Sequence, residues 1–262
     1  MVKSITHVEK SRLGGLRRIQ LYGNLGTPEG RSKGGKKTIS FFHQNPLLAQ
    51  RAGFVIRKEI RCPKRSPELA EFIGIMLGDG SLPGNHQLSI TFNIKTDYEY
   101  AKYICKLLSE LFAVSYHMRR RKDNNGADIL VSSSNLVDFL LKEGLVAGNK
   151  VKNQVGVPSW ICEDSRYRKA CLRGLMDTDG GLYLHRYNSN GKNYEYLKLG
   201  FTNCSKPLLN FVFNTLRKLN YKAYLTGNNV SIYSMPEVKR YLTETGTHNP
   251  KNIKKFKSYF VN

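Results

Sequence analysis

The chain has 262 residues, of which 40% are hydrophobic, and its 42 lysines and arginines against 20 aspartates and glutamates give a net charge of +22. This charge predicts a polyanionic partner, most simply a nucleic acid, and the apolar content is sufficient for a packed core. Five scattered cysteines without a CxxC pair argue against a disulfide framework or a zinc site, and no apolar run approaches the roughly 18 residues of a membrane span.

The first 65 residues are the most basic part of the chain, with 15 basic and 3 acidic residues and a net charge of +12. Between Ser11 and Lys37 stand seven glycines and seven lysines or arginines, a composition that predicts a DNA-binding arm or, alternatively, a solubilising tail. The leucines and the isoleucine within Lys10–Leu21 favour a short helix that packs against another part of the protein. The two glycines in this segment lower its helix propensity. The candidate DNA contacts of this arm are Arg17, Arg18, Arg31, Lys33, Lys36 and Lys37.

Two similar segments, FIGIMLGDG at 72–80 and LRGLMDTDG at 172–180, lie one hundred residues apart. In each, small residues recur every fourth position of a predicted helix, so one helix face has almost no side chains. Two such faces allow helix backbones to approach closely. Ser66 and Pro67 predict the start of the first helix, and Gly80 and Gly180 predict the two ends. The predicted interface consists of Ala70, Gly74, Gly78, Ala170, Gly174 and Thr178.

Asp79 and Asp179 end these two helices. If the small faces pack together, both carboxylates arrive at C-terminal helix ends, where the helix dipoles and their mutual repulsion disfavour their charge. Bound Mg²⁺ would relieve this repulsion and could support phosphodiester hydrolysis. The alternative is that each Asp-Gly only terminates a helix, which a duplicated motif makes improbable. Asp177 has Leu77 as its counterpart, so we interpret it either as a structural acid or as an acid that supports the metal ligands without binding the metal.

The elements after each motif repeat in the same order. In the first half, strands are predicted at 87–94, 114–121 and 128–132, with helices at 98–112 and 136–143. In the second half, strands are predicted at 182–188, 194–203, 221–226 and 229–233, with helices at 208–219 and 237–245. The second half therefore follows the order helix, two strands, helix, two strands, helix, and we expect the first half to follow the same order, although only one strand is assigned before its helix at 98–112.

The two motifs and this order resemble the LAGLIDADG homing endonuclease family in its monomeric, two-motif form, over about residues 66–250. The resemblance implies an α+β fold with two pseudo-symmetric αββαββα repeats that form a DNA-binding antiparallel β-saddle. The expected domains are a basic, glycine-rich arm at 1–65, a first repeat at 66–150, a linker at 151–164 and a second repeat with a basic tail at 165–262.

The resemblance also implies a Mg²⁺-dependent endonuclease, with Mn²⁺ able to substitute, that cuts both strands of a long duplex. No protein partner is expected, and the gene would lie in a mobile intron or stand free. Asp79 and Asp179 would be catalytic and hold metal, together with Gly78 and Thr178. Lys150 and Lys251, which follow the last helix of each half, match the basic residue that the family places near each active site. General neutralisation of phosphate is the alternative role for both lysines.

Open strand faces supply the remaining candidate DNA contacts. Alternation along a strand puts one set of side chains on the helices and the other toward DNA. Arginine can contact guanine and asparagine adenine in the major groove, although most contacts in such complexes go to phosphate. The candidates are His117, Arg119, Arg121, His185, Arg186, Tyr187 and Asn188.

Three other functions are compatible with parts of the sequence. An RNA maturase that assists splicing or a non-cleaving DNA-binding regulator could use the same fold, and a general nucleic-acid chaperone would explain the charge alone. The presence of both motif acids favours cleavage over the maturase and the regulator. A chaperone function would leave the duplicated motif unexplained. The free thiols favour a reducing compartment, either the cytoplasm or an organelle matrix.

Overall fold

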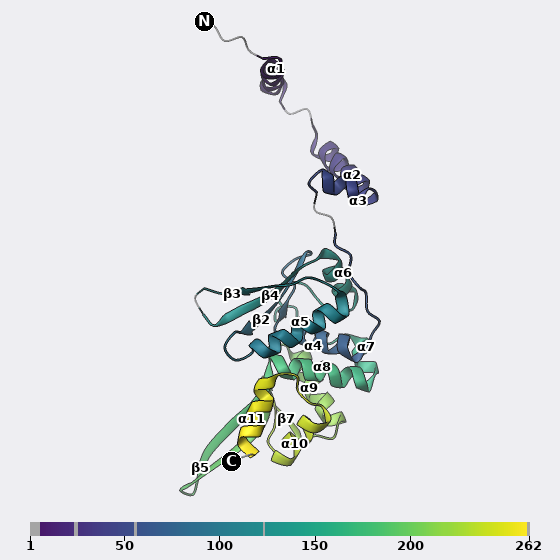
Figure 1. The fold of residues 1–262 in the computed structure, drawn as a ribbon. Helices are drawn as coiled ribbons and strands as arrows, with labels where there is room; N and C mark the ends of the chain where they lie inside the picture. The colour runs from purple at the N-terminus through teal and green to yellow at the C-terminus, as the bar shows by residue number, and fades with distance from the viewer. Residues whose placement is uncertain (1–5, 24–25, 55–56, 123, 261–262) are drawn as a thin grey trace. The chain divides into compact units, whose positions relative to one another are not determined.

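The computed structural model describes residues 6–23, 26–54, 57–122 and 124–260. The chain divides into two units, 1–56 and 57–262 (Figure 1). The expected boundary after residue 65 is therefore wrong, because the segment from Arg57 belongs to the larger unit. Arg61 donates its backbone N–H to the carbonyl of Phe112 at 2.9 Å, and Ile60 packs against the core. None of the described helices is both long and apolar enough to cross a membrane.

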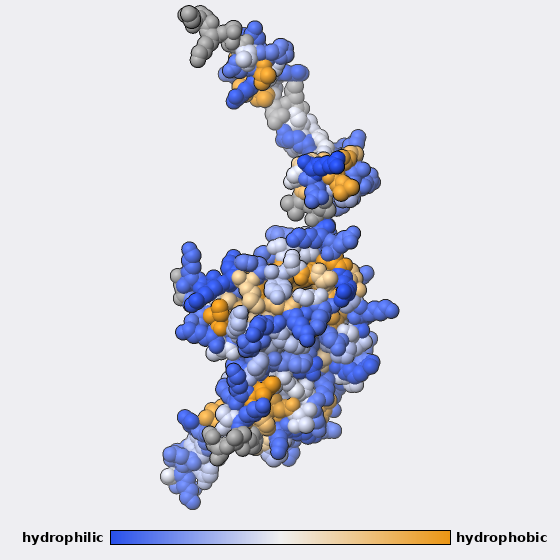
Figure 2. All heavy atoms as spheres, in the orientation of Figure 1, coloured by the Kyte–Doolittle hydropathy of each residue, from blue (hydrophilic) through white to orange (hydrophobic). Residues whose placement is uncertain are grey.

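In the described part of the smaller unit the helices are α1 (His7–Tyr22), α2 (Pro28–Gln44) and α3 (Pro46–Arg51). Helix α1 is longer than the predicted 10–21 despite its two glycines, because Thr6 and Glu9 form a capping box at its start. The basic, glycine-rich stretch after Pro28 is also helical. Among the described residues of this unit only Ala49 is a buried apolar residue, whereas large apolar side chains such as Leu16 and Phe41 are exposed. Figure 2 shows hydrophobic residues at the surface of this unit.

The larger unit contains two repeats of the same order, which confirms the predicted α+β fold with αββαββα repeats. The first repeat comprises α4 (Pro67–Gly78), β1 (Gly80–Ser81), β2 (Gln87–Asn93), α5 (Tyr98–Phe112), β3 (His117–Arg120), β4 (Gly126–Ser132) and α6 (Ser134–Lys142). The second comprises α8 (Ser165–Thr178), β5 (Gly180–Ser189), β6 (Lys192–Thr202), α9 (Lys206–Lys218), β7 (Ala223–Thr226), β8 (Asn229–Ile232) and α10 (Met235–Glu244). The strand orders are β1-β2-β4-β3 and β5-β6-β8-β7, and all pairs are antiparallel.

Helices α7 and α11 lie outside this repeat order. Helix α7 (Ser159–Glu163) occupies part of the expected linker, and Trp160 there is buried and donates its indole N–H to the carbonyl of Glu143 at 3.0 Å. Helix α11 (Pro250–Phe260) replaces the expected basic tail. It lies alongside β5 (Figure 1), where Lys255 Nζ donates to the carbonyl of Leu182 at 2.9 Å.

Alternation along the strands separates an apolar face from an open face. In the first sheet, Ile90 of β2 is opposite Ile129 of β4, and both are fully buried beneath the helices. In the second sheet, Phe201 of β6 is opposite Val230 of β8, and both are again buried. Burial of these apolar side chains is the main stabilising contribution of each repeat.

Helices α4 and α8 pack side by side between the two sheets (Figure 1). A Cβ added at Gly74 would overlap the carbonyl of Cys171, and one added at Gly174 would overlap the carbonyl of Glu71. Farther along, Gly78 lies against the side chain of Thr178. The small faces that the sequence indicated thus meet in parallel register, which brings the C-terminal ends of both helices together.

Candidate active site

Asp79 and Asp179 hold equivalent positions at the adjoining helix ends. Each is the C-terminal cap of its motif helix, with right-handed helical backbone angles. The carbonyl of Asp79 accepts from the N–H of Thr91 on β2 at 3.1 Å, and that of Asp179 accepts from the N–H of Thr202 on β6 at 3.3 Å. Each acid is therefore fixed between its helix and the second strand of its own sheet.

The environments of the two carboxylates differ, and the charge of Asp179 acts on Asp79. Burial raises the pKa of Asp79, and the negative charge of Asp179 raises it further, to about 7. Burial also raises the pKa of Asp179, although Lys150 and a hydrogen bond from Asn203 Nδ2 to its Oδ2 at 2.6 Å oppose this effect. Asp179 is thus better supported as an anion than Asp79.

The two candidate lysines are held differently. Lys150 Nζ donates to the carbonyl of Leu77 at 2.9 Å and to that of Gly78, so it caps the end of α4 while its charge acts on both acids. Burial lowers the pKa of Lys150, and the two aspartates oppose this change. Lys251 Nζ instead pairs with Asp97 Oδ1 at 2.7 Å.

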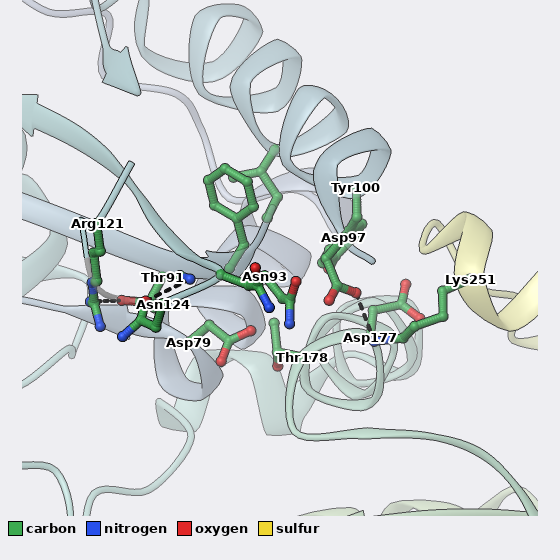
Figure 3. Close-up of a pocket in the computed structure, with 14 residues that line it drawn as sticks. Asp79, Thr91, Asn93, Asp97, Tyr100, Arg121, Asn124, Asp177, Thr178 and Lys251 are labelled. Carbon is green, nitrogen blue, oxygen red and sulfur yellow. Dashed lines mark hydrogen bonds and ion pairs between the residues drawn. The ribbon is translucent and has the colours of Figure 1, made fainter. Parts of the chain in front are cut away.

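A cavity of about 500 Å³ lies on the Asp79 side of the helix ends. Figure 3 shows Asp79 and Thr178 at one edge and the Asp97–Lys251 pair at another. Thr178, a predicted metal ligand, directs its hydroxyl to the carbonyl of Gly174 at 3.0 Å. The cavity is lined by Asp79, Thr91, Phe92, Asn93, Asp97, Tyr100, Ile104, Arg121, Asn124, Asn125, Gly126, Asp177, Thr178 and Lys251.

The arrangement fits a divalent cation held by two carboxylates. The described residues contain no group of three or more His, Cys, Asp or Glu side chains arranged to hold a metal. A cation at Asp79 and Asp179 would therefore complete its coordination with backbone, water or phosphate oxygens, which is how Mg²⁺ commonly binds. The raised pKa of Asp79 indicates that a cation would remove an unfavourable interaction there.

Asp177 is a buried anchor for the chain that follows α10. Its Oδ2 accepts from the N–H of His248 at 2.7 Å, and its Oδ1 accepts from the hydroxyl of Thr247 and from Asn252 Nδ2 at 3.3 Å. Burial raises its pKa to about 6, although the hydrogen bonds oppose the shift. The side chain lies at the rim of the cavity, and its hydrogen bonds are those of a structural acid.

Sequence reasoning missed a second buried acid. Glu71 on α4 accepts from Arg173 Nε on α8 at 3.0 Å and from the hydroxyl of Tyr103 at 2.9 Å, and it also contacts His248 Nδ1 at 2.6 Å. Together these groups join both motif helices to α5 and to the segment after α10. A glutamate within an otherwise apolar helix was the available signal.

On the first sheet, the predicted arginines share the open face with His117. Arg121 Nη2 donates to Asp128 Oδ1 at 2.6 Å, and Arg119 Nη2 lies 3.4 Å from Asp128 Oδ2. Thr91 also donates to Asp128, at 2.9 Å. Because Asp128 is buried while both arginines stay largely exposed, it positions them and leaves part of each guanidinium free for a ligand.

On the second sheet, β5 and β6 extend as a long two-stranded ribbon (Figure 1). Its open face carries rings, since Tyr187 stacks on Tyr194 with centroids 5.1 Å apart and His185 contacts Tyr196 at the same distance. Arg186 lies on the opposite face, where it pairs with Glu195. On that face, near the tip, Asn188 Nδ2 donates to Asn193 Oδ1 at 2.9 Å. The candidates of this ribbon therefore divide between its two faces.

The candidate contacts of the smaller unit all lie on exposed helix surface. Two of the residues are on α1 and four are on α2. Arg31 Nη1 donates to the carbonyl of Gly26 at 2.6 Å, which stabilises the first turn of α2. The residues are Arg17, Arg18, Arg31, Lys33, Lys36 and Lys37.

The first repeat matches a known family. Residues 71–151 match the LAGLIDADG DNA endonuclease family, a span that contains Asp79 and Lys150, whereas Asp179 lies beyond it. No curated protein sequence matches the chain.

Solved structures with similar folds include full-length DUF199/WhiA from Thermatoga maritima, at a TM-score of 0.49 and 14% identity over 76% of this chain and 63% of that one. The chain thus spans less than two thirds of the length of that protein. I-DmoI in complex with DNA and Mn is similar at a TM-score of 0.44 and 18% identity over 69% of this chain and 96% of that one. The meganuclease I-AabMI bound to uncleaved DNA is similar at a TM-score of 0.49 and 10% identity over 72% of this chain and 89% of that one.

Proposed function

We propose that this chain, which belongs to the LAGLIDADG DNA endonuclease family through its residues 71–151, hydrolyses a phosphodiester bond in each strand of a duplex DNA target. The observation that carries the proposal is the pair of acids, Asp79 and Asp179, at the adjoining ends of two tightly packed helices. Burial and the charge of Asp179 raise the pKa of Asp79 to about 7, so the pair is unfavourable without a cation. Two aspartates that served only to end their helices would not need to lie where the charge of one raises the pKa of the other.

A divalent metal ion is the cofactor that the donor set fits best, and we expect Mg²⁺, with Mn²⁺ as a substitute. Asp79 and Asp179 would hold it, and when bound it would activate a water and stabilise the leaving oxygen. Lys150 supplies positive charge beside both acids and holds the end of α4 in place. Lys251, paired with Asp97 at the cavity, would be drawn toward an incoming phosphate.

The open faces of the two sheets are the surfaces that we expect to meet DNA. The first sheet offers the arginines held by Asp128, and the second offers the two-stranded ribbon of β5 and β6, a kind of element that can enter the major groove. The basic helices α1 and α2 would add contacts to phosphate. Because α1 and α2 bury almost none of their own apolar side chains, we expect them to dock only when DNA is bound.

The proposed biological role is homing, in which a monomer cuts the uninterrupted form of the site where its own gene is inserted. The test uses a plasmid that carries the two flanks of the gene joined together. With Mg²⁺ the chain should linearise this plasmid, EDTA should stop the reaction, and the double variant Asp79→Asn, Asp179→Asn should bind without cutting. Specific binding without cleavage in Mg²⁺ or Mn²⁺ would instead support a regulator, and stimulation of intron splicing by such a chain would support a maturase.

A further inference from the structure

The open face of the second sheet is rich in aromatic rings. Strand alternation and register place these rings on the side opposite the buried Leu199 and Phe201. Tyr187 and Tyr194 stay nearly half exposed, and no described strand residue on this side is an acid. The ring-lined face consists of Tyr183, His185, Tyr187, Tyr194, Tyr196, Tyr224 and Tyr233.

Several of these ring faces are already in contact within the protein. Tyr187 and Tyr194 lie nearly parallel, at 15° and with centroids 5.1 Å apart, so one face of each is covered. Tyr183 lies over Gly200, where an added Cβ would come within 3.3 Å of the ring, and Lys255 Nζ is 5.7 Å from its centroid. The rings therefore present mainly edges and hydroxyls. Unpaired bases, which stack on free ring faces, are a poorer match for this surface than the grooves of a duplex.

The open face of the first sheet has different chemistry. Among its described strand residues none is Tyr, Phe or Trp. Arg121 donates to the buried Asp128 and, at 3.0 Å, to Thr91, while Arg119 lies 3.4 Å from the same carboxylate. Both arginine side chains stay largely exposed. A guanidinium held in this way can bind the O6 and N7 atoms of guanine in the major groove.

The second sheet lacks an equivalent arginine on its ring-lined face. Arg186, the only arginine in the described strands of that sheet, lies on the opposite face and pairs with Glu195. In the major groove the bases expose their edges, and the C5 methyl of thymine is the apolar group among them. Contact between this methyl and a ring edge removes apolar surface from water. Thymine is therefore the base that best fits the ring-lined face.

We propose that the ring-lined face contacts a thymine-rich half of the DNA target through thymine methyl groups, whereas the first sheet contacts a half that contains guanine. The inference rests on the proposed DNA endonuclease function and adds to it the base composition of each half of the target. Tyr187 and Tyr194 then determine specificity in one half, and Arg121 determines it in the other.

The first test selects duplex DNA from a random pool by binding to the full chain in EDTA. The selected sequences should have an excess of thymine in one half and recurrent guanine in the other. Deoxyuridine in place of thymine removes only the methyl group, so in the thymine-rich half it should weaken binding about four-fold for each contacted methyl. The same replacement in the other half should change the Kd less than about two-fold.

Protein variants assign each half to its sheet. Tyr194→Ser should reduce the effect of deoxyuridine in the thymine-rich half and leave the guanine preference intact, whereas Arg121→Ala should remove only the guanine preference. Tyr116 provides the matched control, because it is 44% exposed like Tyr194 but lies beside Cys105 of α5, away from the ring-lined face. Tyr116→Ser should keep both preferences.

The outcomes separate this inference from the proposed function. A pool without enriched sequences, an equal or absent effect of deoxyuridine in the two halves, or a guanine preference that depends on Tyr194 would overturn the inference. Competition by single-stranded DNA as strong as by the duplex would also overturn it, in favour of base stacking. Selected DNA that shows both preferences but is not cut in Mg²⁺ or Mn²⁺ would refute the proposed nuclease activity and leave this inference standing.

Discussion

Replacing Asp79 with asparagine should stabilise the metal-free protein at pH 8 and leave its stability nearly unchanged at pH 4. The pKa of Asp79 rises from an ordinary value of 3.8 to about 7 on folding. Between these values the folded state binds more protons than the unfolded state, so wild-type stability falls as pH rises from about 4 to about 7 and then stays constant. Asparagine resembles the neutral acid, so the unfolding free energy of the variant does not fall in this way as pH rises.

The size of the effect follows from the same linkage. Each ten-fold change in proton affinity corresponds to about 1.4 kcal/mol, which sets an upper limit of about 4 kcal/mol for Asp79→Asn above pH 7. Asp79 is partly exposed to solvent, so we expect a measured gain of about 1 to 3 kcal/mol. Urea denaturation of both proteins in EDTA, at several pH values from 4 to 8, gives the difference in unfolding free energy directly.

Asp97→Asn is the matched control with the opposite sign. Burial raises the pKa of Asp97, but hydrogen bonds from Lys251, Thr96 and Asn249 outweigh it and the pKa lies below its usual value. Asp97 therefore contributes stability above about pH 4 that is lost as pH falls, and its replacement should destabilise the protein at neutral pH. A pH-independent gain for Asp79→Asn, or a loss of stability at pH 8, would refute the electrostatic reasoning.

Two further predictions concern the helix pair and the smaller unit. Gly174→Leu should destabilise the larger unit by about 3 kcal/mol or more, because its side chain would overlap the carbonyl of Glu71, and an unchanged denaturation midpoint would contradict this packing. Removal of residues 1–56 should weaken DNA binding and reduce the slope of log K against log salt, because fewer counterions are released. An unchanged slope in fluorescence titrations would show that the smaller unit does not contact phosphate.

Local pattern was sufficient to predict the motif helices and most strands. The small residues around Gly74 and Gly174 indicated a close helix pair because their four-residue spacing reports directly on one helix face. The strands predicted at 87–94, 182–188 and 194–203 overlap β2, β5 and β6. Helix α11 was missed because its basic composition resembles a solvated tail.

Long-range partners could not be predicted in the same way. Asp97 pairs with Lys251, and Glu71 with Arg173 and His248, across 154, 102 and 177 residues of chain. Nothing in the local sequence of either partner specifies the other. The difference between Lys150 and Lys251 likewise depends on tertiary packing, since both follow the last helix of a repeat and yet only Lys150 caps a motif helix.

The most direct test of the central claim compares Asp79→Asn and Asp179→Asn on a duplex target with each strand labelled separately, in the presence of Mg²⁺. If the two acids form the active site, both variants should bind the target at least as tightly as the wild type and lose double-strand cleavage, with any residual activity limited to a nick. Full double-strand cleavage by either variant would contradict the assignment of the paired aspartates.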